Sequence, residues 1–137
     1  MLGVTENVLW MLTALAGVVV LLTRMRLSAE RQAGHAQIPM SIVHAHTVVG
    51  VLAIAVWVYY LNGPSDLVGL GSLALWWLEA LIGVLILARW LPGGGAHAAD
   101  AVDDSWAQGP SLSILGHVGM VLGVAFFTFC VVTGRVG

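Results

Sequence analysis

The 137-residue sequence contains no lysine and a single cysteine, Cys130. Without lysine, the chain has neither the Schiff-base residue of a retinal protein nor the lysine of a phosphate-binding P-loop. One cysteine makes no intrachain disulfide and no iron–sulfur site. No Ser/His/Asp or Cys/His arrangement stands in a convincing context, so we do not expect a hydrolase.

Charge is also scarce. Only 9% of the residues are charged, against about 25% in a typical soluble domain. By contrast, 59% are hydrophobic and the mean hydropathy is +0.95. Four apolar stretches, near 7–25, 39–61, 68–91 and 111–134, are each long enough to cross the bilayer, which takes roughly 20 helical residues. The sequence predicts one all-α domain over 1–137, an integral membrane four-helix bundle.

The arginines predict its orientation. Those near one pair of span ends are Arg24, Arg26, Arg31 and Arg89. Only Arg135 lies on the other side. Positive residues accumulate on the cytoplasmic side, so we expect the 26–38 and 92–110 loops in the cytoplasm and both termini outside. An arginine-rich, lysine-free composition with much Ala, Gly and Val is typical of GC-rich bacterial genomes. The predicted location is therefore the inner (plasma) membrane, as a multi-pass protein.

Three histidines lie inside the predicted spans. His44 and His46 follow the start of the second span at about Pro39, and His117 follows the start of the fourth at about Ser111. At 1.5 Å per residue, all three are roughly 8–10 Å below the same membrane face. Ionisable residues inside a membrane are costly and commonly mark a function. Two histidines on facing helices are the arrangement that binds a haem b iron from both sides.

Helix geometry separates the two neighbouring histidines. Residues two apart differ by roughly 200° around a helix, so His44 and His46 cannot both face one iron. His46 is followed by Gly50 and Ala53 at helical spacing, and small residues leave room for a flat macrocycle. We predict His46 and His117 as the axial ligands of one haem b, with His44 in reserve. The alternative interpretation is that the histidines lie at the level of the lipid headgroups and that the glycines serve close packing of the helices.

Glycines also flank the fourth-span histidine, at Gly116, Gly119 and Gly123. Met120, about one turn from His117, is an alternative ligand, although methionine at helical spacing more often packs. Arg24 or Arg26, at the cytoplasmic interface, is the predicted partner of a haem propionate.

Two stretches resemble haem-binding helices of cytochrome b-561-type membrane proteins. The first is Ser41-Ile-Val-His-Ala-His-Thr-Val-Val-Gly50, with its His-x-x-x-Gly pattern. The second is Leu115-Gly-His-Val-Gly-Met-Val-Leu-Gly123, which continues to Gly134. The resemblance implies a four-helix core that holds haem b between paired histidines and transfers electrons. That family's core holds two haems, whereas this chain carries span histidines near one face only, which implies one.

Glu79, near the middle of the third span, is the remaining ionisable group. We interpret it as a proton-relay or hydrogen-bonding site, or as a neutral carboxyl bonded to a hydroxyl such as that of Thr13 or Thr47.

Three functions stay open. The first is a haem subunit, acting as the electron-transfer part of an oxidoreductase complex, that exchanges electrons with quinone or a partner redox protein. The second is a cofactor-free structural or assembly subunit of a larger respiratory complex. The third is a transition-metal-binding protein that uses the histidines. Each predicts lipid and other membrane subunits as partners and no nucleic acid.

Overall fold

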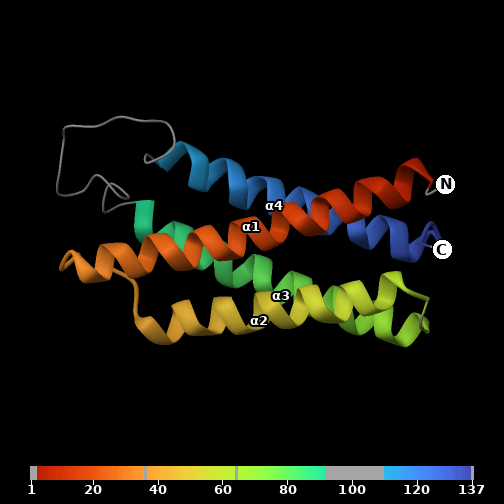
Figure 1. The fold of residues 1–137 in the computed structure, drawn as a ribbon, viewed down its shortest axis with the longest axis horizontal. Coiled ribbons are helices and arrows are strands. Elements are labelled where there is room, and N and C mark those ends of the chain that lie inside the picture. The colour runs from red at the N-terminus through yellow and green to blue at the C-terminus, as the bar shows by residue number, and fades with distance from the viewer. Residues whose placement is uncertain (1–2, 36, 64, 92–109, 137) are drawn as a thin grey trace.

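The computed structural model describes residues 3–35, 37–63, 65–91 and 110–136. They form four helices, α1 (Val4–Gln32), α2 (Met40–Leu61), α3 (Asp66–Trp90) and α4 (Pro110–Val132), and no strand. Consecutive helices run in opposite directions, so both termini lie at one end of the bundle (Figure 1). The all-helical prediction is confirmed for these residues. Most of the predicted 92–110 loop lies outside them.

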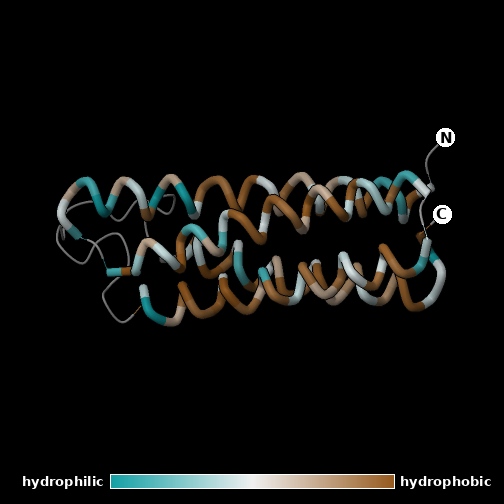
Figure 2. Tube along the Cα trace, turned by 90° about the horizontal axis from the view of Figure 1, so that it is seen from below, coloured by the Kyte–Doolittle hydropathy of each residue, from teal (hydrophilic) through white to brown (hydrophobic). Residues whose placement is uncertain are grey.

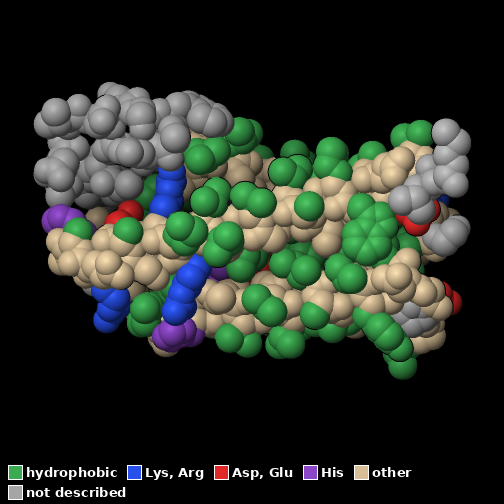
Figure 3. Space-filling view, in the orientation of Figure 1, with side chains coloured by type: hydrophobic (Ala, Val, Ile, Leu, Met, Phe, Trp, Pro, Cys, Tyr) green, Lys and Arg blue, Asp and Glu red, His purple; other side chains and the backbone are tan. Residues whose placement is uncertain are grey.

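All four helices are long and apolar enough to cross a membrane. Hydrophobic residues run along the whole bundle, whereas hydrophilic residues gather mainly toward the end where α1 is joined to α2 (Figure 2). On the face shown in Figure 3, hydrophobic side chains cover the middle and most of the arginine and histidine side chains lie near that same end. This distribution is that of a multi-pass membrane protein, because the outward surface of its spans faces lipid.

The first helix is longer than a span requires. Its 29 residues extend roughly 43 Å, against a hydrocarbon core of about 30 Å. The apolar stretch gives way to a polar final part, yet the helix continues because that part contains no glycine or proline before Gly34. There Glu30 accepts a hydrogen bond of 2.9 Å from Trp90 Nε1, which joins the end of α1 to the end of α3.

Glycine ends the first two helices. Gly34, after α1, has φ +86°, and Gly63, after α2, has φ +103°. These left-handed conformations are accessible to glycine without steric cost and are typical of the residue that follows a helix C-terminus.

The packing is uneven around the bundle. α3 packs closely against α2 and α4, and α1 packs against α2 but least closely against α4. Towards the termini, a large apolar cluster centres on Trp57, which stacks on Phe127 with ring centroids 4.4 Å apart. A smaller apolar cluster around Val43 and Trp90 lies at the opposite end. The buried ionisable side chains lie between these two clusters.

Candidate functional site

Three buried ionisable side chains from three helices form a polar layer inside the bundle. They are His46 from α2, Glu79 from α3 and His117 from α4, with relative exposures of 3%, 3% and 9%. The rings of His46 and His117 face one another, with centroids 6.3 Å apart and planes inclined by 48°. The matching depth expected from the sequence therefore corresponds to a direct approach of the two side chains.

His117 is oriented by its own helix. Its Nδ1 lies 2.8 Å from the carbonyl oxygen of Ser113, one turn earlier. A carbonyl only accepts hydrogen bonds, so in the neutral ring Nδ1 carries the proton and Nε2 keeps its lone pair. Nε2 is buried and has no hydrogen-bond partner among the described residues. An imidazole held through Nδ1 with Nε2 available is the usual state of a histidine that binds a metal.

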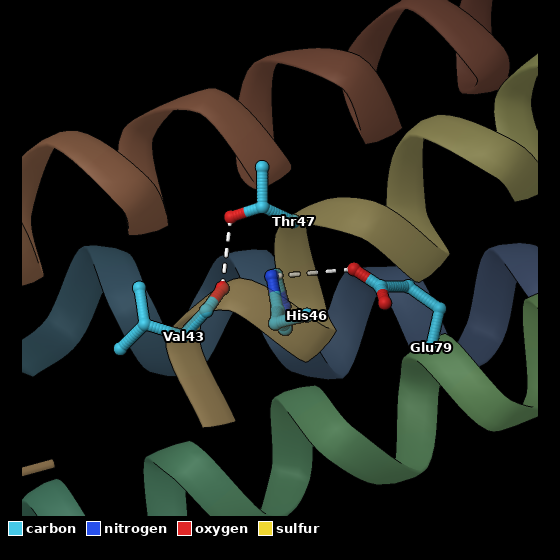
Figure 4. Close-up of polar contacts among 4 residues, drawn as sticks. All are labelled: Val43, His46, Thr47 and Glu79. Carbon is cyan, nitrogen blue, oxygen red and sulfur yellow. Dashed lines mark hydrogen bonds and ion pairs between the residues drawn. The ribbon is translucent and has the colours of Figure 1, made fainter. Parts of the chain in front are cut away.

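His46 is oriented by the third helix. Its Nδ1 lies 3.3 Å from Glu79 Oε1 (Figure 4). This distance is long for a hydrogen bond, and neither Glu79 oxygen has a hydrogen-bond partner among the described residues. The contact nevertheless directs Nδ1 of His46 towards the carboxyl group and Nε2 away from it.

Gly83 marks the point where the two imidazoles converge. A Cβ atom at this residue would lie 3.4 Å from Nε2 of His46 and 3.4 Å from Nε2 of His117, so the two nitrogens are at most twice that distance apart. It would also lie 2.9 Å from Cδ2 of His117, too close for any side chain without displacement. Because the residue is glycine, α3 can approach both imidazole rings closely at this point.

The other predicted cofactor-binding residues lie outside this layer. His44 faces away, and its Nδ1 accepts a hydrogen bond of 2.9 Å from Arg24 at the exposed surface. Arg26 is closer to the layer, because its Nη1 donates a hydrogen bond of 2.7 Å to Oγ of Ser113. Ser113 thus contacts Arg26 through its hydroxyl group and His117 through its carbonyl.

Glu79 is not bonded to either hydroxyl considered in the sequence. Oγ1 of Thr13 donates to the carbonyl of Leu9 and accepts from Trp57 Nε1, and Oγ1 of Thr47 donates to the carbonyl of Val43 (Figure 4). Threonine in a helix commonly bonds back to the carbonyl four residues earlier, which occupies its hydroxyl proton.

The glycines do not all leave free space. A Cβ at Gly50 would lie 2.6 Å from Glu79 Oε1 and 2.8 Å from Val20 Cγ2, so the space beside His46 is filled by those side chains. Cβ atoms at Gly119 and Gly123 would meet nothing within 4 Å. These two glycines and Met120 line a groove between α1 and α4.

Sequence reasoning missed Gly83 and the carbonyl of Ser113. The position of Gly83 four residues after Glu79, on the same helical face, was the available signal for the first. The second had no signal, because every residue supplies a carbonyl. No protein-family model, curated protein or solved structure matches the chain.

Proposed function

We propose that the chain is a bacterial plasma-membrane haem subunit that holds one haem b between His46 and His117 and exchanges electrons with quinone or a partner redox protein. In this proposal the arginine-rich end faces the cytoplasm and both termini face outward. One observation carries it: two buried imidazoles on different helices place their Nε2 atoms within 3.4 Å of the same position, that of a Cβ at Gly83.

The separation of the rings supports two imidazoles that share one metal ion. Imidazole nitrogens bind transition metals at about 2.0–2.1 Å. With the ion on the line between two such nitrogens, the ring centroids are roughly 6–6.5 Å apart. The rings of His46 and His117 are 6.3 Å apart. His46 and His117 are therefore the residues that would hold the haem iron, and their imidazole chemistry and ring separation agree with that role.

The number of protein ligands favours haem over a bare ion. Among the described residues, no group of three or more His, Cys, Asp or Glu side chains is placed to hold a metal. A protein-bound transition metal usually takes three or four protein ligands. In haem the porphyrin supplies four, and the protein supplies the axial pair. The likeness of α2 and α4 to haem-binding helices of cytochrome b-561-type proteins agrees with this choice.

When bound, the haem would supply one-electron redox chemistry. The chain's own residues then have positional roles. The Ser113 carbonyl and Glu79 orient the two rings, and Gly83 leaves the coordination point clear. Arg26, bonded to Ser113 beside His117, is a better-placed propionate partner than Arg24, which is bonded to His44 on the surface.

A cofactor-free structural subunit is the second candidate. The close packing at Gly50 and Gly83 favours it, because both glycines allow neighbouring side chains to fill the interior. In that case Gly83 serves to pack α3 against the two rings, and the histidines stabilise the bundle through polar contacts alone.

Haem retention in single histidine variants separates these candidates. The chain would be purified from haem-replete cells as wild type, His46→Ala, His117→Ala and His44→Ala. The haem proposal predicts about one haem per chain in the wild type and in His44→Ala, and loss from the other two variants with all four spans still inserted. Full haem occupancy in His117→Ala would show that the ligand assignment is wrong. A wild type without haem would favour the structural subunit.

A further inference from the structure

A groove of about 610 Å³ runs between α1 and α4 on the outer surface of the bundle. It is lined from Leu12 to Arg26 on α1 and from Leu112 to Phe127 on α4. From Leu12 to Arg26 the helix rises by 14 residues, at 1.5 Å each, so the groove is roughly 21 Å long. It follows the seam where two adjacent helices pack least closely. Its long side is therefore open to the membrane interior.

The polar groups of the groove lie toward one end. They are Thr23, Arg26, Ser113 and His117, and among the described residues that line the groove none is acidic. The hydroxyl and guanidinium groups donate hydrogen bonds, and Nη1 of Arg26 is 2.7 Å from Oγ of Ser113. This end suits a head group that accepts hydrogen bonds.

The rest of the groove suits an apolar chain. Beyond His117 its lining is aliphatic, aromatic or glycine. Side chains are absent at Gly119 and Gly123, and the space next to both is open. At Gly116 the two helices come closer, since a Cβ there would be 3.5 Å from Val19 Cγ2. The groove therefore combines a donor-rich head region with a long apolar channel, as sites for small amphiphiles do.

His117 belongs to the polar layer and also borders the groove. Its Nε2 is buried and directed to Gly83 on the inner side. A flat head group at the polar end of the groove would thus contact the outer side of a proposed haem ligand. In the proposed haem subunit, an electron carrier in this groove would lie next to the haem ligand His117, whereas a phospholipid there would take no part in the electron transfer.

The geometry points to an isoprenoid quinone as the occupant of this groove. Its carbonyl groups would accept hydrogen bonds near Arg26 and Ser113, and its prenyl tail would follow Gly119 and Gly123 towards Phe127. This inference rests on the proposed function, and it selects quinone rather than a protein as the direct electron partner. When bound, the proposed haem would supply one-electron redox chemistry, so a quinol, which gives up two electrons and two protons, would be matched by two copies of the chain. The chain's own part would be to hold the head group beside His117 through Arg26 and Ser113.

The test compares variants that fill the groove with a matched control. Gly119→Leu and Gly123→Leu, singly and together, place side chains in open space and leave both histidines unchanged. Gly71→Leu is the control, because a Cβ at this exposed glycine on α3 also meets nothing within 4 Å. Each purified protein is assayed for haem by its pyridine haemochrome, for quinone and phospholipid by solvent extraction and mass spectrometry, and for the rate of haem reduction by decylubiquinol.

We expect about one quinone per chain in the wild type and in Gly71→Leu. The double variant Gly119→Leu/Gly123→Leu should keep its haem, retain at least tenfold less quinone, and be reduced by decylubiquinol at least tenfold more slowly. Phospholipid in place of quinone, or equal quinone and equal rates in all variants, would overturn the quinone inference while the haem proposal stands. A wild type without haem would overturn the proposed function itself, whatever its quinone content.

Discussion

Substitution of Gly83 by alanine places a methyl group at the convergence point of the two histidines. The new Cβ would be 2.9 Å from Cδ2 of His117 and 3.4 Å from Nε2 of both His117 and His46. Atoms at the shorter distance must move apart, and the His117 ring is held by its bond to the Ser113 carbonyl. Overpacking of this kind costs about 1–3 kcal/mol.

The matched control for this substitution is Gly71→Ala on the same helix. Replacing glycine by alanine within a helix stabilises it by about 1 kcal/mol through intrinsic propensity alone. At Gly71 the methyl group meets nothing, so that gain is the whole effect. The free energy of unfolding of Gly83→Ala should therefore be about 1–3 kcal/mol below that of Gly71→Ala.

Unfolding in mixed micelles with increasing denaturing detergent, followed by circular dichroism, measures this difference. Haem content provides a second measurement, since the methyl group also occupies the proposed coordination point. We expect Gly83→Ala to lose most of its haem and Gly71→Ala to keep it. Equal stability and equal haem content in the two variants would refute the described approach of α3 to the imidazoles.

Two further substitutions test the packing around the polar layer. Gly50→Ala should be about 1–3 kcal/mol less stable than Gly71→Ala, because its Cβ would be 2.6 Å from Glu79 Oε1. Adding Glu79→Ala should recover part of the loss, and strict additivity in a double-mutant cycle would contradict the contact. Thr13→Val should cost about 1–3 kcal/mol by leaving the buried Trp57 Nε1 without its acceptor. Thr47→Val, which removes only a bond to its own helix, should cost clearly less in the same unfolding assay, and equal losses would contradict the role of Thr13.

Much of the fold follows from the sequence, because long apolar stretches leave a chain in lipid few alternatives to helices. The end of α1 was harder to predict. The predicted span ends at residue 25, whereas the helix continues to Gln32. Hydropathy marks where a helix leaves the hydrocarbon core, but the helix itself ends only at a residue such as Gly34 that favours another backbone conformation.

The candidate site was predictable in part. Helical periodicity separates His44 from His46, and the structure places His46 inside and His44 at the surface. The contact of Glu79 with His46 depends on the rotation of α3 against α2, which a single sequence does not specify. The same holds for Gly50, whose missing side chain accommodates Glu79 and Val20. Small residues show where helices approach closely, but not which group fills the space.

The most direct test of the central proposal is the reduced-minus-oxidised visible spectrum of the purified wild-type chain, with a pyridine haemochrome assay for stoichiometry. Ligation by His46 and His117 predicts a sharp α-band and about one haem b per chain. A featureless spectrum from protein purified out of haem-replete cells would contradict the haem proposal and leave the cofactor-free structural subunit as the better account.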